Sequence, residues 1–104
     1  MNQNSETYVI STNVQVPNHQ VQLVRDNRSR SGLTMTNHGS SIVSFGFRNE
    51  TGINRGIELH PAQTVTITEQ YDGDFTRVEL VAVSQGTNCE LSVYQLIRYT
   101  GGSF

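Results

Sequence analysis

The sequence predicts an all-β fold, an antiparallel β-sandwich of jelly-roll or immunoglobulin-like type with about seven or eight strands. Apolar and polar residues alternate in many short runs, and turn residues separate these runs roughly every eight to twelve residues. The composition is 35% hydrophobic and only 15% charged. Ser, Thr, Asn and Gln make up the difference, which favours strands over helices. We therefore expect one domain with a single core and no helix.

The clearest strand patterns lie between residues 56 and 75. Apolar residues occupy alternate positions, first at Ile57 and Leu59 and then at Val65 and Ile67. This period of two is typical of half-buried antiparallel strands. Two turns follow these strands, because Pro61 has no backbone N–H and the Asp-Gly pair at 72–73 is typical of a hairpin.

The other strands are expected from the same alternation, taken in order along the chain. Residues 19–25 and 33–36 alternate first, and residues 43–47 form the next run. Residues 75–83 are expected to form the most apolar strand, and the unbroken apolar run at 80–83 indicates burial on both faces. The last strand covers residues 91–97.

The alternation also predicts which side chains lie between the two sheets. Val43, Phe45 and Phe47 share one face of their strand, so both phenylalanine rings are expected in the core. The predicted buried set is Leu23, Leu33, Met35, Val43, Phe45, Leu59, Val65, Ile67, Leu80, Val83, Leu91 and Val93.

The chain is expected to divide into three parts. Residues 1–18 are predicted to form an extended N-terminal arm, and residues 19–99 the β-sandwich domain. Residues 100–104 are predicted to form a flexible tail.

The arm is the first candidate partner-binding segment. It starts with a polar stretch, and Pro17 favours extended backbone at the residue before it. The short apolar patch formed by Tyr8, Val9 and Ile10 is too small to make a core alone. We therefore expect the arm to contact a neighbouring subunit or another protein, whose strand edge accepts its backbone hydrogen bonds.

The basic residues indicate assembly. All seven are Arg, and Arg is enriched at protein interfaces whereas Lys is depleted there. Three of them, Arg25, Arg28 and Arg30, lie in one polar loop, which is the second candidate partner-binding segment. We expect a homo-oligomer, with a trimer as first choice. The formal net charge of −2 does not favour nucleic-acid or membrane partners.

No catalytic, cofactor or metal site is predicted. The single cysteine, Cys89, leaves no partner for an internal disulfide and is expected to be a small core residue. His19, His38 and His60 lie far apart in sequence, without the spacing of zinc ligands. The acidic turn at 72–74 has too few ligands for a calcium loop. We therefore expect a protein that is not an enzyme.

Three segments resemble small virion proteins of tailed bacteriophages. Residues 56–67 are similar to the pattern apolar-x-Leu-x-Pro-Gly-x-Ser/Thr-apolar-x-apolar, with Ala62 in place of the usual Gly. Residues 32–39 resemble the strand and turn that precede it, and residues 81–95 resemble a closing hairpin. The resemblance implies a structural role in capsid decoration, a head fibre or the neck, in a symmetric oligomer.

The leading hypothesis is therefore a capsid decoration protein, made in the host cytoplasm, that binds the major capsid protein or another virion protein. The alternative is a ligand-binding β-sandwich that recognises a carbohydrate or a receptor. A tyrosine-based sugar site is compatible with the composition, whereas the absence of Trp argues against the commonest aromatic platform. A small enzyme is the third hypothesis, which the residues support least.

Overall fold

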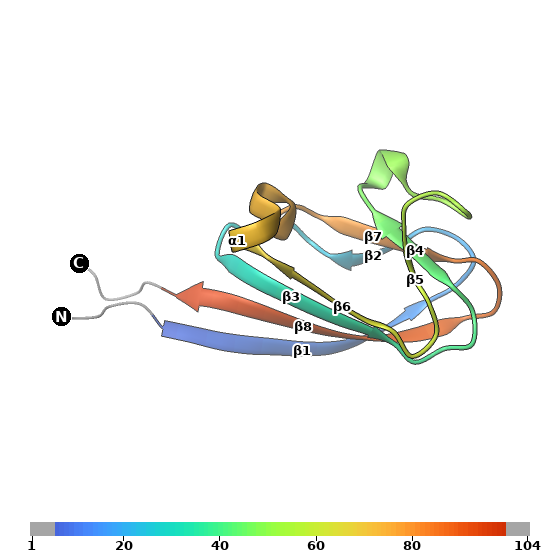
Figure 1. Ribbon diagram of the computed structural model, residues 1–104, viewed down its shortest axis with the longest axis horizontal. Coiled ribbons are helices and arrows are strands. Elements are labelled where there is room, and N and C mark those ends of the chain that lie inside the picture. The colour runs from blue at the N-terminus through green and yellow to red at the C-terminus, as the bar shows by residue number, and fades with distance from the viewer. Residues whose placement is uncertain (1–5, 100–104) are drawn as a thin grey trace.

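The computed structural model describes residues 6–99, which form two four-stranded antiparallel sheets (Figure 1). Sheet A has the strand order β1-β8-β3-β6, and sheet B has the order β2-β7-β4-β5. Only the β4–β5 connection joins neighbours within one sheet, and the other connections between these strands cross the sandwich. This arrangement is a jelly roll, which confirms the predicted sandwich and selects one of its two expected types. The strands are β1 (Glu6–Val16), β2 (Val21–Val24), β3 (Arg30–Asn37), β4 (Val43–Gly46), β5 (Ile57–Leu59), β6 (Thr64–Thr68), β7 (Leu80–Ser84) and β8 (Cys89–Tyr99).

The core lies between the two sheets and matches the predicted set closely. Each predicted residue lies in this core except two. Val65 is only partly buried and packs against the others, and Val83 is buried but points to the outer side of sheet B, so it does not lie between the sheets as expected. Phe45 is completely buried, but Phe47 is 43% exposed, because it follows the last residue of β4 and lies beyond the end of the strand. The expectation that Phe47 belongs to the core was therefore wrong. Ile57 is also largely exposed, because β5 is the edge strand of sheet B.

The described part of the expected arm is a strand of the sandwich. Strand β1 pairs with β8 along its whole length, from Glu6 opposite Tyr99 to Val16 opposite Cys89. Val16 is fully buried, which fixes this strand to the core. The expected boundary at residue 18 is therefore corrected, since the sheet already includes residue 6. The expected flexible tail, residues 100–104, and the first five residues lie outside the described part of the chain.

Short helical turns form where none was expected. A helix, α1 (Glu69–Asp72), and a 3₁₀ turn, η2 (Gly73–Thr76), connect β6 to β7, and a second 3₁₀ turn, η1 (Arg48–Glu50), follows β4. The predicted Asp-Gly hairpin is wrong because β6 and β7 belong to different sheets. Stacked sheets are about 10 Å apart, and a two-residue turn does not span that distance.

Candidate binding surfaces: a free strand edge and a hydroxyl face

The first candidate surface is the free edge of β1, which we call the β1 edge. Strand β1 is at the margin of sheet A, and its eleven residues make it the longest edge strand of the fold. From Thr7 to Val16 it contains neither a charged residue nor a proline. Natural sheets protect their edges by making them short, charged or interrupted by proline. The β1 edge lacks these features, so its backbone is available for pairing with another chain.

Apolar side chains are exposed at the outer end of this strand. Tyr8 is 50% exposed, Val9 56% and Ile10 37%. Tyr8 and Ile10 alternate with the buried Val16 and so lie on the inner side of sheet A, whereas Val9 lies on the outer side. Tyr8 and Ile10 are exposed because β1 and β8 extend past the strands of sheet B (Figure 1). The structure thus brings the expected apolar patch together with an unprotected edge.

The arginine loop divides into two exposed residues and one buried residue. Arg25 and Arg28 are exposed, as a partner-binding role requires. Arg30 is 1% exposed, and this corrects its expected role as a partner-binding residue. As the first residue of β3, it points inward between the sheets. Burial lowers the pKa of its guanidinium group, with Asp26 acting weakly in the opposite direction.

The Arg30 side chain instead connects β3 to three other parts of the chain, which are residues 76–78, residue 25 and strand β8. Its guanidinium donates to the carbonyl oxygens of Thr76 at 2.7 Å, Val78 at 2.7 Å and Arg25 at 3.0 Å. It also donates to the side-chain amide oxygen of Gln95 at 2.9 Å. Most of these acceptors are backbone groups that any residue would offer, so the sequence carries no signal that identifies them.

The second candidate surface is the outer face of sheet A, which we call the hydroxyl face. The register places one row of residues across its strands, with Ser11, Tyr94, Thr34 and Thr66 side by side. The hydroxyl oxygens of Thr34 and Thr66 are 3.3 Å apart. In the next row the hydroxyls of Thr36 and Thr64 are 2.8 Å apart, and the ring nitrogen Nε2 of His38 lies 2.6 Å from the Ser92 hydroxyl. The face consists of Ser11, Asn13, Thr34, Thr36, Thr64, Thr66, Thr68, Ser92 and Tyr94.

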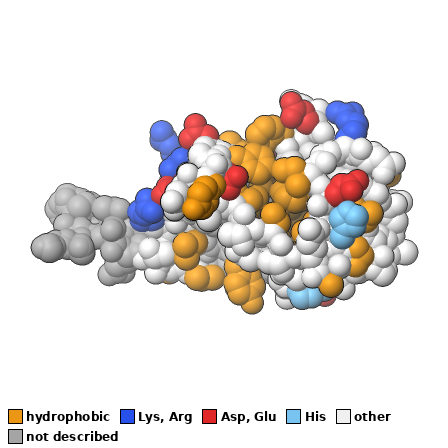
Figure 2. All heavy atoms as spheres, in the orientation of Figure 1, with side chains coloured by type: hydrophobic (Ala, Val, Ile, Leu, Met, Phe, Trp, Pro, Cys, Tyr) orange, Lys and Arg blue, Asp and Glu red, His pale blue; other side chains and the backbone are white. Residues whose placement is uncertain are grey.

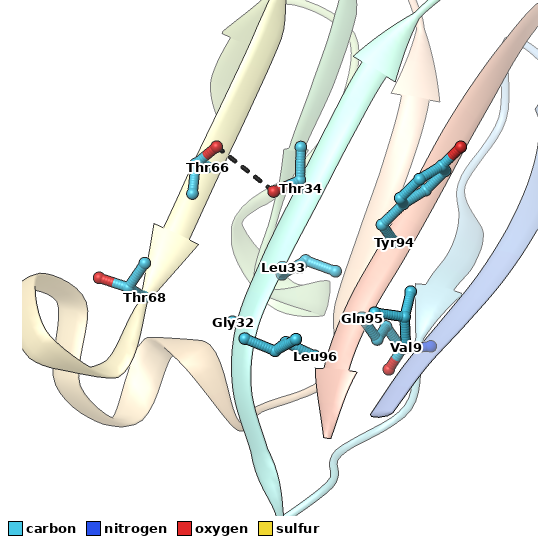
Figure 3. A pocket seen from close by; sticks show the side chains of 9 residues that line it. All are labelled: Val9, Gly32, Leu33, Thr34, Thr66, Thr68, Tyr94, Gln95 and Leu96. Atoms are coloured by element: carbon cyan, nitrogen blue, oxygen red, sulfur yellow. Dashed lines mark hydrogen bonds between the residues drawn. The ribbon is translucent and has the colours of Figure 1, made fainter. Parts of the chain in front are cut away.

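Two depressions adjoin each other on the hydroxyl face. The first has a volume of about 270 Å³ and lies over Gly32, between Thr66 and Thr68 on β6 and Tyr94 and Leu96 on β8 (Figure 3). Gly32 has no side chain, so the floor of this depression is the backbone of β3. The second has a volume of about 330 Å³ and is lined by Thr34, Thr36, His38, Ser92 and Tyr94. Thr34 and Tyr94 border both depressions.

The pair formed by His38 and Ser92 has the distance of a base and a nucleophile, but its surroundings do not support catalysis. A serine nucleophile needs an oriented histidine and backbone N–H donors for the oxyanion. Ser92 and His38 lie on the open outer face of the sheet. The backbone N–H groups around them already form hydrogen bonds between β3 and β8, so they do not point at an oxyanion. Within residues 6–99 there is also no group of three or more His, Cys, Asp or Glu residues placed to hold a metal ion.

The outer face of sheet B carries a network of long polar side chains. Arg48 donates to Glu79 at 2.6 Å, and Gln22 donates to the same carboxylate at 2.7 Å. The bond from Arg48, followed by that from Gln22, lowers the pKa of Glu79 to about 2. Gln20 donates to the carbonyl oxygens of Arg48 and Thr51 and so holds the η1 turn against β2. Sequence patterns do not reveal this network, because hydrogen-bonded partners within it lie up to 57 positions apart.

Hydrophobic side chains also gather in the open side of the sandwich, between α1 and β5 (Figure 2). Phe47 and Phe75 pack edge to face there, with ring centroids 5.3 Å apart. A depression of about 170 Å³ beside them is lined by Phe45, Ile57 and neighbouring residues.

The sequence matches no family model and no curated protein. Solved structures are nevertheless similar in fold. A chain from Bacillus endospore appendages, described as a novel family of disulfide-linked pili, matches with a TM-score of 0.54 at 12% identity, over 92% of this chain and 88% of that one. The major capsid protein P2 of bacteriophage PM2 matches with a TM-score of 0.48 at 16% identity, over 96% of this chain and 47% of that one. The first similarity shows a shared fold, and the second is too weak to support more.

None of the helices between residues 6 and 99 has the length and apolar character needed to cross a membrane.

Proposed function

We propose that this chain is a structural subunit that attaches to a larger assembly through the β1 edge. The observation that carries the proposal is the combination of an unprotected edge strand of eleven residues with exposed apolar side chains at its end. An incoming strand would satisfy the free backbone groups and cover Tyr8 and Ile10 at once. Arg25 and Arg28, both exposed in the loop between β2 and β3, are available for polar contacts with the same partner.

The finer form of the proposal is a decoration protein of a bacteriophage capsid. The sequence resemblance to small virion proteins supports it, and the partner is then the major capsid protein or another virion protein. A homo-oligomer, first of all a trimer, is the expected state on the particle. The virion is the expected location, after synthesis in the host cytoplasm.

A charged substitution on the β1 edge tests the proposal. Lysine at an edge opposes strand addition, so Ile10→Lys should weaken oligomerisation and binding to the parent particle. Ile53→Lys is the matched control, because Ile53 is 51% exposed and lies outside the sheets. Light scattering with size-exclusion chromatography measures the oligomer, and co-sedimentation with the particle measures binding. Equal behaviour of both variants and the unmodified chain would refute attachment through this edge.

A filament subunit is the second candidate, favoured by the shared fold with the appendage chain over most of both sequences. In this chain the disulfide linkage described for those pili has no counterpart, because Cys89 is the only cysteine and is buried. Subunits would have to join through non-covalent contacts. Electron microscopy of the concentrated chain distinguishes the two candidates, since filaments would favour this one and closed oligomers the first.

A further inference from the structure

We propose that the hydroxyl face of sheet A binds a neutral carbohydrate, with the ring of Tyr94 as its stacking platform. This site is separate in function from attachment through the β1 edge. Tyr94 is 52% exposed on β8, the interior strand next to β1, so its ring stands on the outer face of the sheet and not at the free backbone edge, although Val9 of β1 also lines the site.

The shape of the face suits a small, flat ligand. The two depressions border the same tyrosine, one on each side, with volumes of about 270 and 330 Å³. Ligand sites commonly measure roughly 300–1,000 Å³, so the two together provide room for a short oligosaccharide. Gly32 creates the first depression by leaving the strand surface bare between Leu96 and Thr68 (Figure 3).

The charge of the site indicates a neutral ligand. The residues that line the two depressions include no Asp, Glu, Lys or Arg. Nucleic acids and anionic sugars are usually held by Arg or Lys, which this surface does not offer. The nearest charged positions on the outer side of β8 are Glu90 and Arg98, at opposite ends of the strand.

The distribution of polar and apolar groups indicates a sugar in particular. Val9, Leu96 and the Tyr94 ring give one side an apolar surface, and Thr34, Thr36 and Ser92 give the other side hydroxyl groups. A pyranose ring has the same division, with a C–H face that stacks on aromatic rings and hydroxyls around its rim. A lipid would require a continuous apolar surface, which the hydroxyls interrupt.

The hydroxyl groups are able to exchange their present partners for those of a ligand. Thr34 pairs with Thr66 and Thr36 pairs with Thr64, and both pairs are exposed. Each hydroxyl rotates freely, so it serves as donor or acceptor according to the group that approaches. His38 adds a ring nitrogen beside Ser92 that acts in the same way.

Titration of the full, isotope-labelled chain with neutral gluco-, galacto- and manno-oligosaccharides tests the proposal by nuclear magnetic resonance. We expect at least one of these sugars to shift the amide signals of residues 32–36 and 92–96, with weak, millimolar binding. Tyr94→Ala should weaken binding about tenfold, because it removes the stacking surface. Tyr71→Ala is the matched control, since Tyr71 is 82% exposed and lies on α1.

A second variant tests how much the depression over Gly32 contributes to sugar binding independently of Tyr94. A Cβ atom at Gly32 would lie 3.4 Å from Leu96 Cβ, an ordinary contact, so Gly32→Ala should fold normally while raising the floor of the site. We expect it to weaken sugar binding several-fold with an unchanged amide spectrum elsewhere.

Four results would overturn the proposal. The first is no shift with any of these sugars, and the second is a set of shifts that maps to another surface. Preferential binding of sulfated or sialylated sugars would contradict a neutral ligand. If the signals of this face instead change with protein concentration alone, the face is a contact between copies of the chain.

Discussion

The two outer faces of the sandwich differ in what covers them. On sheet B, Val81 and Val83 alternate with the core residue Ala82 and so point outward, yet they are 0% and 3% exposed. On sheet A, Tyr94 and Leu96 occupy the corresponding side of β8 and are 52% and 40% exposed. Both strands lie in the interior of their sheets, so the difference comes from what lies above them.

The covering of sheet B is built from its own loops. A Cβ atom added to Gly46 would lie 2.9 Å from the Thr51 hydroxyl, so the segment after β4 folds back over this face. Gln20 holds that segment in place, and Gln85 donates to the buried Ser44 hydroxyl at 3.0 Å. No loop of this kind crosses the described part of sheet A. The outer face of sheet B therefore contributes to the stability of the fold, whereas the outer face of sheet A is free for contact with a ligand or partner.

The largest predicted effect is for a substitution in the core that lies between the two sheets and supports both of them. Phe45 is completely buried between the sheets, so Phe45→Ala should lower the free energy of unfolding by roughly 3–5 kcal/mol. Urea denaturation measures the change. Phe47→Ala is the control, since Phe47 is 43% exposed and should cost less. A loss of under about 1 kcal/mol for Phe45→Ala would contradict its burial in the core.

The next effect compares the two faces directly. Val81→Ala removes two buried methyl groups from the covered face and should cost about 2 kcal/mol. Leu96→Ala removes more carbon from the open face, but its side chain is already 40% exposed, so we expect a loss of about 1 kcal/mol or less. A larger loss for Leu96→Ala than for Val81→Ala would reverse the assignment of covered and open faces.

The third prediction concerns the dependence of stability on pH. The pKa of Glu79 is about 2 in the folded protein, below its ordinary value of 4.5. A lowered pKa in the folded state means that Glu79 stabilises the fold above pH 4.5 and that this stabilisation is lost as the pH falls through about 2. Glu79→Gln should therefore flatten the decline in the urea midpoint between these pH values, and high salt should reduce the difference. Glu50→Gln, in the η1 turn that also contains Arg48, provides the control. An unchanged pH profile for Glu79→Gln would show that the network on sheet B does not contribute to stability.

The strands and core were predictable from sequence because they depend on local alternation. Leu33 and Met35, or Leu91 and Val93, are two apart and buried, as the period of two requires. Which strands pair with each other, and in which sheet, was not predictable in the same way. The acidic turn at 72–74 was predicted as a hairpin connection, but it crosses from one sheet to the other, as does the turn at residues 60–63.

The candidate surfaces were predictable only in part. Tyr8, Val9 and Ile10 stand out as an exposed patch, but their pairing with β8 depends on residues more than 80 positions away, which the alternation of β1 does not reveal. The hydroxyl face was visible in sequence as alternate threonines, without the register that aligns Thr34 with Thr66. At Ala62 the sequence showed only that Ala replaces the Gly of the resembled pattern. Its φ of 66° lies in the left-handed region, which Gly adopts most readily.

The smallest predicted effect compares one hydroxyl on each face. Ser44 on sheet B is fully buried and accepts a bond from Gln85, so Ser44→Ala should cost about 1 kcal/mol. Thr36 on sheet A pairs with Thr64 in an exposed position, so Thr36→Val should change the free energy of unfolding by no more than about 0.5 kcal/mol.

Valine keeps the branched shape of threonine and its preference for strands, so this substitution removes the hydroxyl with little other change. Water replaces the lost hydrogen bond for Thr64, whereas the environment of Ser44 gives water less access. Thermal unfolding of both variants beside the unmodified chain measures the difference. If Thr36→Val destabilises the chain as much as Ser44→Ala, the hydroxyls of sheet A contribute to the fold. They would then be less free to bind a ligand, and the contrast between the two faces would be smaller than their exposure indicates.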